Sequence, residues 1–327
     1  MMNDIDNQPV GGIYVYRGGR APNNITHAVI DKSVKVIDEG AFRNNPFLHT
    51  VEMHDGIDRV REEAFHLCHS LLYVNLRRVQ ILDSLAFANS GLTHVDGDDL
   101  EIIRDNAFQG CENLKKIAFS SLRVIEPCAF EDTDLRELNL PEVEQIGVCA
   151  FVSNSHLRRI AIPLKANLFF IDPLADDSEI VDTAFSGCHI NHVDLIGSIH
   201  ETVSSLHMES WRNDMTHEIN QINKTLENSY SSKQNTAVIR WWLQSVCSRI
   251  EHYKTEHLKV LKAATVLLEL ALWKAKLSEK DEDESSDCAK VKRIKIDVED
   301  ARSEARGSCG AGMNIIIKNV LPFLELK

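Results

Sequence analysis

The sequence predicts an α+β fold, in which a solenoid of short parallel β-strands with a period of about 22 residues is capped by a C-terminal α-helical bundle. The dipeptide Ala-Phe recurs at seven equivalent repeat positions before residue 190, and the apolar spacing becomes helical after residue 200. The charge divides at the same point. Residues 1–200 hold 17 Lys and Arg against 30 Asp and Glu, whereas residues 201–327 hold 19 of each, so the net charge of −13 belongs to the first part.

The overall composition excludes several classes of protein. The 327 residues are 43% hydrophobic, which is too apolar for a mainly disordered chain. The acidic net charge argues against nucleic acid or an anionic membrane as a partner. The longest apolar runs are far shorter than the ~20 residues that cross a bilayer. The first residues, MMNDIDNQPVGG, have neither a basic start nor an apolar stretch, so we expect no secretory signal and a cytoplasmic location.

The repeat has a defined frame, I-x-x-x-A-F followed after five or six residues by L-x-x-V-x-L. The Ala-Phe dipeptides begin at Ala41, Ala64, Ala86, Ala107, Ala129, Ala150 and Ala184. The apolar residue four positions before each is Ile37, Val60, Leu82, Ile103, Ile125, Ile146 and Ile180. Of the 28 frame positions 27 are apolar, with Gly97 as the exception, whereas the bulk composition predicts about 12. A period in the low twenties is typical of a solenoid.

Each L-x-x-V-x-L segment predicts a short strand whose central Val and last Leu point inward. Neighbouring strands then stack about 4.8 Å apart into a parallel sheet, and the stacked coils share one continuous core. The Ala-Phe dipeptide predicts a tight turn on the opposite wall, with Phe filling the space between coils. We expect an N-terminal cap in residues 1–24 and the solenoid in residues 25–199.

The last Ala-Phe interval is 34 residues long, about 12 more than the period. We therefore expect an insertion near residues 164–177, which contains Phe169 and Phe170. It is interpreted as a loop that packs its Phe pair locally, with a partner-binding loop as the alternative.

Helical periodicity begins near residue 202 and predicts helices over about 206–226, 236–252 and 255–277. These form the C-terminal module, residues 200–280, which would cap the last coil. Residues 281–312 are charged and contain glycines, and are expected to be a flexible linker. The apolar tail, residues 313–327, is expected to dock on the helical module. The basic run 290–295 makes nuclear import an alternative to a purely cytoplasmic location.

The repeat frame resembles the BspA-like leucine-rich repeats, whose recognisable core is A-F-x-x-C-x-x-L. Cys68, Cys111 and Cys188 stand where that family carries its cysteine, and the resemblance covers about residues 25–195. The runs 199–207, 267–274 and 315–324 resemble the C-terminal module of the large leucine-rich-repeat protein families of diatoms. This resemblance implies a fold and an intracellular or unassigned setting, and it brings no catalytic residues.

The candidate chemistry is sparse. No C-x-x-C motif occurs, and Cys68, Cys111 and Cys188 hold one repeat position, so we expect them to stack as a buried structural ladder. Cys128 and Cys149 each precede an Ala-Phe and would form a second ladder. The His residues offer no metal-ligand spacing, and there is no phosphate-binding glycine loop or nucleophile elbow. We predict no catalytic residues, no metal and no cofactor.

The strongest candidate for a functional site is the outer face of the predicted strands. Residues just before the central apolar position point away from the core. They form a column that is aromatic, imidazole-bearing and mostly cationic. Its predicted protein-binding members on the concave face are Tyr73, His94, Lys116, Glu137, Arg159 and His192. The column two residues further along each strand is small or acidic and leaves room for a partner.

These observations together predict a monomeric, non-enzymatic scaffold that binds a protein partner on the concave face of the solenoid. Two alternatives stay open. One is a secreted or cell-surface adhesin-like repeat protein, and the other is a structural protein that oligomerises through its C-terminal helices.

Overall fold

The computed structural model describes residues 10–169, 183–196, 209–227 and 234–283. The chain divides into two units, residues 1–247 and 248–327. The first unit contains the solenoid, α2 (Glu209–Glu227) and the start of α3 (Asn235–Asp283). The second contains the remainder of α3. The predicted linker 281–312 lies outside the described residues apart from its first three positions. The basic run 290–295 and the tail 313–327 lie outside them entirely.

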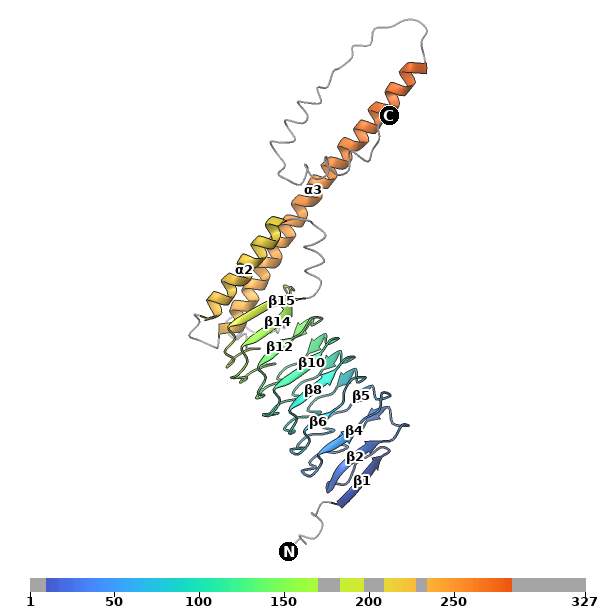
Figure 1. The fold of residues 1–327 in the computed structure, drawn as a ribbon, viewed down its shortest axis with the longest axis vertical. Helices are drawn as coiled ribbons and strands as arrows, with labels where there is room; N and C mark the ends of the chain where they lie inside the picture. The colour runs from blue at the N-terminus through green and yellow to red at the C-terminus, as the bar shows by residue number, and fades with distance from the viewer. Residues whose placement is uncertain (1–9, 170–182, 197–208, 228–233, 284–327) are drawn as a thin grey trace, which may run out of the picture. The chain divides into compact units, whose positions relative to one another are not determined.

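One face of the solenoid, here called the sheet face, carries nine parallel strands among the described residues (Figure 1). They are β1 (Val10–Tyr16), β2 (Ile25–Ile30), β4 (Thr50–Glu52), β6 (Tyr73–Val74), β8 (His94–Gly97), β10 (Lys116–Phe119), β12 (Glu137–Asn139), β14 (Arg159–Pro163) and β15 (His192–Ile196). Their pairing places equivalent residues of successive coils opposite one another, as with Lys116 and His94 or Arg159 and His192. The predicted parallel-strand solenoid is confirmed.

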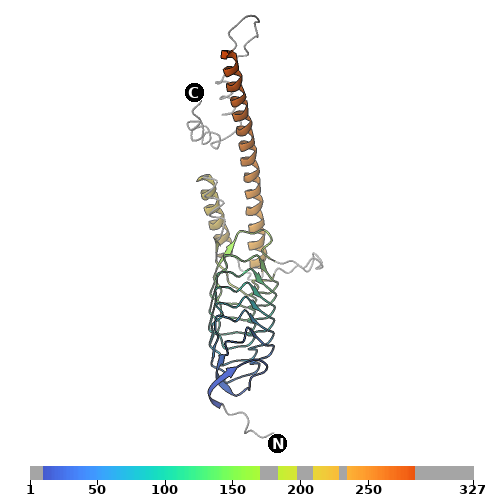
Figure 2. The same ribbon diagram turned by 90° about the vertical axis from the view of Figure 1, so that its right-hand side faces the viewer.

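A second wall carries a narrower parallel sheet in the order β13-β11-β9-β7-β5-β3. Its two-residue strands are β3 (Val36–Ile37), β5 (Arg59–Val60), β7 (Ile81–Leu82), β9 (Ile102–Ile103), β11 (Val124–Ile125) and β13 (Gln145–Ile146). The second residue of each strand is the predicted apolar residue before the Ala-Phe turn, and all six are buried. Figure 2, turned by 90°, shows the coils stacked one on another.

The Ala-Phe turns form the third side, and all 14 of their residues are buried. The Phe N–H of one coil donates to the Ala carbonyl of the next, for example from Phe65 to Ala86 and from Phe108 to Ala129, both at 2.8 Å. The residue before the Ala has a left-handed φ in Glu63, Cys128 and most of the other coils. This conformation costs about 1–2 kcal/mol for a residue with a Cβ. The hydrogen bonds and the buried aromatic ring of each turn offset that cost.

The Phe rings stack in one continuous column along the solenoid. Successive centroids are 5.0–5.5 Å apart, and the interplanar angles are 14° or less. The column comprises Phe42, Phe65, Phe87, Phe108, Phe130, Phe151 and Phe185. Aromatic pairs at such distances add about 0.5–1.5 kcal/mol to the gain from burial alone. The repeated Phe therefore ties each coil to its neighbours.

The predicted cysteine ladder is part of a longer buried column of polar side chains. The thiols of Cys68, Cys111 and Cys188 each donate to the Phe carbonyl of the preceding coil at 3.0–3.1 Å. The coils without a cysteine place Asn45, Ser90, Thr133 and Asn154 at the same position, and all four are buried. Burial raises the pKa of Cys68 and of Cys188 to about 12, so both thiols stay protonated and unreactive. The three cysteines, Thr133 and Asn154 thereby satisfy Phe carbonyls that the turns leave inside the core.

Gly97, the exception in the apolar frame, is explained by its neighbour in the next coil. Gly97 pairs with Phe119, which occupies the frame position that Leu holds in other coils. A Cβ on Gly97 would lie 3.3 Å from the Phe119 ring and 3.1 Å from the Cβ of Leu100. The missing side chain in one coil is thus replaced by the larger one in the next.

The N-terminal end of the solenoid is closed by β1 and Tyr16. Strand β1 pairs in parallel with β2, and the fully buried ring of Tyr16 lies 5.0 Å from that of Phe42. The Tyr16 hydroxyl donates to Asp38 Oδ2 at 3.2 Å and accepts from the Asp38 N–H at 3.3 Å. Burial raises the pKa of Tyr16 to about 12. Tyr16 therefore continues the Phe column and ends it with a satisfied hydroxyl.

The C-terminal end is closed by polar side chains from the helices. No further coil follows Phe185 among the described residues, and its N–H donates instead to Thr236 Oγ1 at 2.9 Å. Asn235 Nδ2 donates to the Cys188 carbonyl at 3.1 Å. On the last strand, the Val193 N–H donates to Asn223 Oδ1 of α2 at 2.8 Å. The residues of α2 and of the first turns of α3 thus supply the acceptors and donors of an absent coil.

The start of the predicted insertion near residues 164–177 continues the coil. Phe169 is buried and bridges Ile146 of β13 in parallel, as the next wall strand would do. Its ring meets that of Phe185 edge-on at 5.9 Å. Phe170 and the rest of that segment lie outside the described residues.

The C-terminal helices differ from the prediction in one respect. The segments predicted as separate helices over 236–252 and 255–277 form the single helix α3 of 49 residues. No Pro or Gly lies between residues 234 and 283, so nothing in the backbone forces a break. The helix predicted over 206–226 is confirmed as α2, which begins at Glu209 within the described residues.

Replacing Thr236 by Val tests the C-terminal closure. The substitution keeps the shape of the buried side chain but leaves the Phe185 N–H without an acceptor, which costs about 1–3 kcal/mol. We expect urea denaturation to report a loss of that size. Thr225→Val is the matched control, because this exposed threonine of α2 bonds only within its own helix, and we expect a change below about 0.5 kcal/mol. Equal midpoints for the two variants would show that Thr236 does not close the solenoid.

Candidate functional site

The alternation along each sheet-face strand positions the predicted binding column. In β10 and β12 the first residue is exposed and the next is buried, so Lys116 and Glu137 point outward while Ile117 and Leu138 enter the core. Strand pairing continues the column from His27 and Thr50 at one end to Arg159 and His192 at the other. All six predicted site residues therefore lie on one face, in register from coil to coil.

The structure divides these six residues into two groups. Tyr73 and His94 form an aromatic pair in the middle of the sheet face, with ring centroids 4.8 Å apart and an interplanar angle of 25°. The Tyr73 residue is 40% exposed, and the neighbouring Leu72 is 52% exposed. An exposed aromatic ring held against a second ring presents a large apolar surface that loses little conformational freedom on binding.

The second group lines an open groove of about 1250 Å³ over β10, β12, β14 and β15. Lys116, Glu137 and Arg159 are among its lining residues. The small side chains of Ala118 and Ala161 also line it, and they belong to the column predicted to leave room for a partner. Tyr73, His94 and His192 lie outside this lining.

Arg159 is held by the neighbouring strand. Its Nε and Nη2 lie 2.9 and 2.8 Å from Asp194 Oδ2, and His192 Nε2 lies 3.1 Å from Asp194 Oδ1. The ion pair fixes the guanidinium over the groove while leaving more than half of the Arg159 side chain exposed. Arg159 and His192 thus share one carboxylate.

Two further groove residues escaped the sequence prediction. Lys115 and Arg136 are exposed, line the groove and stand one position before Lys116 and Glu137. A strict alternation of inward and outward residues places Lys115 and Arg136 before the start of the strand, so neither was counted as an outward residue. The sequence does carry a signal for them, because Lys115, Arg136 and Arg158 occupy the same position in successive repeats.

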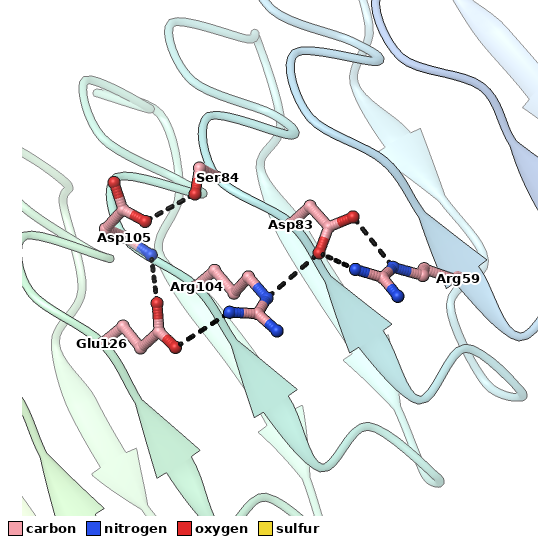
Figure 3. Close-up of polar contacts among 6 residues, drawn as sticks. All are labelled: Arg59, Asp83, Ser84, Arg104, Asp105 and Glu126. Atoms are coloured by element: carbon pink, nitrogen blue, oxygen red, sulfur yellow. Dashed lines mark hydrogen bonds and ion pairs between the residues drawn. The ribbon is translucent and has the colours of Figure 1, made fainter.

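The opposite wall carries charged residues of a different character (Figure 3). Arg59 donates to both oxygens of Asp83 at 2.8 Å, and Arg104 Nε lies 3.1 Å from Asp83 Oδ1. Arg104 also reaches Glu126 at 3.5 Å, and Glu126 accepts the Asp105 N–H at 3.2 Å. The charges on this wall are therefore paired from coil to coil, which indicates a structural role.

In the described part of the chain, no three His, Cys, Asp or Glu side chains are grouped so as to hold a metal ion. None of its helices has both the length and the apolar character needed to span a membrane.

The repeat and its geometry agree with a known family. The family model for the BspA type leucine rich repeat region matches six copies, over residues 21–99 and 82–201. The chain belongs to the BspA-type leucine-rich-repeat family. Within this BspA-type solenoid, Lys115, Lys116 and Arg136 of the sheet face make no ion pair with the described residues, whereas Arg159 of the same face pairs with Asp194.

Solved leucine-rich-repeat structures are similar to this BspA-type chain at low sequence identity. A leucine-rich repeat protein from Bacteroides ovatus is 17% identical, with 57% of this chain and 70% of that chain covered and a TM-score of 0.28. The T. pallidum leucine rich repeat protein is 21% identical, with 44% and 71% covered and a TM-score of 0.31. A leucine rich cell surface protein from Faecalibacterium prausnitzii is 18% identical, with 54% and 65% covered and a TM-score of 0.31. No curated protein matches the chain.

Proposed function

We propose that this BspA-type protein is a non-enzymatic scaffold that binds a protein partner on the sheet face of its solenoid. The observation that carries the proposal is the exposed Tyr73–His94 pair, followed along the same face by the open groove that Lys116, Glu137 and Arg159 line. Aromatic and arginine side chains are the usual anchors of protein interfaces. Leucine-rich-repeat solenoids in general present an extended face of this kind to protein partners.

Two other surfaces of the solenoid are already occupied by contacts within the chain, which favours the sheet face as the binding surface. Side chains of the narrow wall are engaged in the coil-to-coil ion pairs of Arg59, Asp83 and Arg104, and a partner would have to break these pairs. The C-terminal end of the solenoid is covered by α2 and the first turns of α3. The sheet face needs no such rearrangement, because its outward side chains make few bonds to one another.

The scaffold acts as a monomer in the cytoplasm under this proposal. All six cysteines among the described residues are free thiols, and Cys68, Cys111 and Cys188 use their S–H groups inside the core. A reducing compartment preserves those groups. The elongated sheet face is complete within one chain, so binding does not need a second copy.

Site-specific photo-crosslinking tests the proposed face. With p-benzoylphenylalanine in place of Tyr73, we expect a discrete adduct to a cellular protein. The same group in place of the exposed Arg61, away from the sheet face, should give none. Tyr73→Ala and Arg159→Ala should then each lower the affinity for the captured partner by more than about fivefold, or ~1 kcal/mol, with the fold unchanged. Adducts from position 61 alone, or full affinity in the double variant, would contradict the proposal.

Exposed apolar side chains on α3 favour oligomerisation as the second candidate function. Leu258, Val266, Leu267 and Leu270 are 49–61% exposed. In solution, light scattering should give the 36.9 kDa of one chain if the scaffold is a monomer. A mass of twice that value, returned to 36.9 kDa by Leu267→Lys with Leu270→Lys, would instead establish an oligomer built through α3.

A further inference from the structure

The charges of the two walls are organised differently, and this difference identifies the chemistry of the partner. On the narrow wall, Arg59 and Arg104 both pair with Asp83. On the sheet face, Lys115, Lys116 and Arg136 make no ion pair and no side-chain hydrogen bond within the described part of the chain. These three cations of the sheet face therefore lack a counter-charge within the described part of the chain, unlike Arg159 of the same face and unlike Arg59 and Arg104 of the narrow wall.

These cations are crowded together. Lys116 begins β10 and Lys115 directly precedes it, and Arg136 directly precedes β12 on the neighbouring coil. The Arg158 N–H donates to the Arg136 carbonyl at 3.0 Å, so a further guanidinium follows on the next coil, where it bonds only to backbone carbonyls. Like charges on adjacent strands destabilise a sheet, since coils stack only about 4.8 Å apart. A solenoid with a net charge of −13 has carboxylates in excess, yet places none within ion-pair distance of Lys115, Lys116 or Arg136 among its described residues.

The groove beside the cations is shaped for a length of polypeptide. Its volume of about 1250 Å³ extends over four strands, and Ala118 and Ala161 keep it open. Glu137 and Asn139 line it as polar groups that can bond to the main chain of an occupant. At the other end of the cationic cluster, Leu72 and Tyr73 offer an exposed apolar contact.

We propose, building on the proposed function, that the partner docks through an acidic segment that bears an apolar residue. Its carboxylates pair with Lys115, Lys116 and Arg136, and its apolar side chain packs on Leu72 and Tyr73. Charge complementarity selects this occupant, because the segment supplies the counter-charges that the solenoid itself does not. A nucleic acid fits less well, since Asp98, Glu137 and Asp194 also line the groove and would meet a continuous row of phosphates.

A synthetic probe tests this partner chemistry on the full chain. The probe is a fluorescein-labelled dodecapeptide of Glu and Asp with one central Leu, followed by anisotropy at low ionic strength. We expect saturable binding that weakens about tenfold in Lys115→Glu with Lys116→Glu and Arg136→Glu. The matched control reverses Lys32, Lys35 and Arg61, which are exposed away from the groove, and should change affinity by less than about twofold.

Further arms of the experiment separate the sources of failure. If the triple variant fails to fold, the single Arg136→Gln variant, which adds no negative charge, serves as the test. It should lower the affinity for the probe about threefold. Equal loss in the control triple variant would overturn the inference, as would equally tight binding of a twelve-nucleotide thymidine oligonucleotide. If position 73 still crosslinks a cellular protein while the acidic probe does not bind, the proposed face stands and the acidic chemistry is wrong.

Discussion

A coil of this solenoid cannot complete its own hydrogen bonds, and the rest of the structure depends on that constraint. Each Ala-Phe turn sends its Phe N–H to the Ala carbonyl of the next coil, so every coil needs a successor at the same spacing. Successors at a constant spacing require a constant period, which stacks the Phe rings and aligns the buried column of Cys, Ser, Thr and Asn side chains. Where the repeat stops, another element must offer the same acceptor, and Thr236 does so at the C-terminal end.

Because of the same constraint, only outward-pointing side chains of the coils are free to contact a partner. Side chains at interior positions pack between the coils. Burial keeps the thiols of Cys68 and Cys188 protonated, so these thiols are unreactive. On the narrow wall, charged side chains of neighbouring coils form ion pairs with one another. The sheet face alternates inward and outward residues, which frees one side chain in two from the core. The exposed aromatic pair of Tyr73 and His94 and the cluster of Lys115, Lys116 and Arg136 both lie on this face.

The sequence predicted what is periodic and missed what is not. Repetition revealed the strands, the buried Phe column and the outward column that contains Tyr73 and Lys116, because one repeat explains all the others. Tyr16 and Phe169 could not be found in this way, since each ends or replaces a repeat through contacts that are distant in sequence. The helix α3 was divided in two because its apolar pattern weakens near residue 253, while continuity depends on backbone bonds that no breaker interrupts. Strict alternation likewise hid Lys115 and Arg136 at the strand edges.

Amide hydrogen exchange measured residue by residue tests the central claim most directly. If one ladder runs through the solenoid and is closed by α3, the N–H groups of all seven turn Phe residues exchange slowly, including that of Phe185. The last coil should then be about as protected as Phe151 in the coil before it. Rapid exchange at Phe185 beside slow exchange at Phe151 would contradict the helical closure, and rapid exchange at Phe87 or Phe108 would contradict the ladder itself.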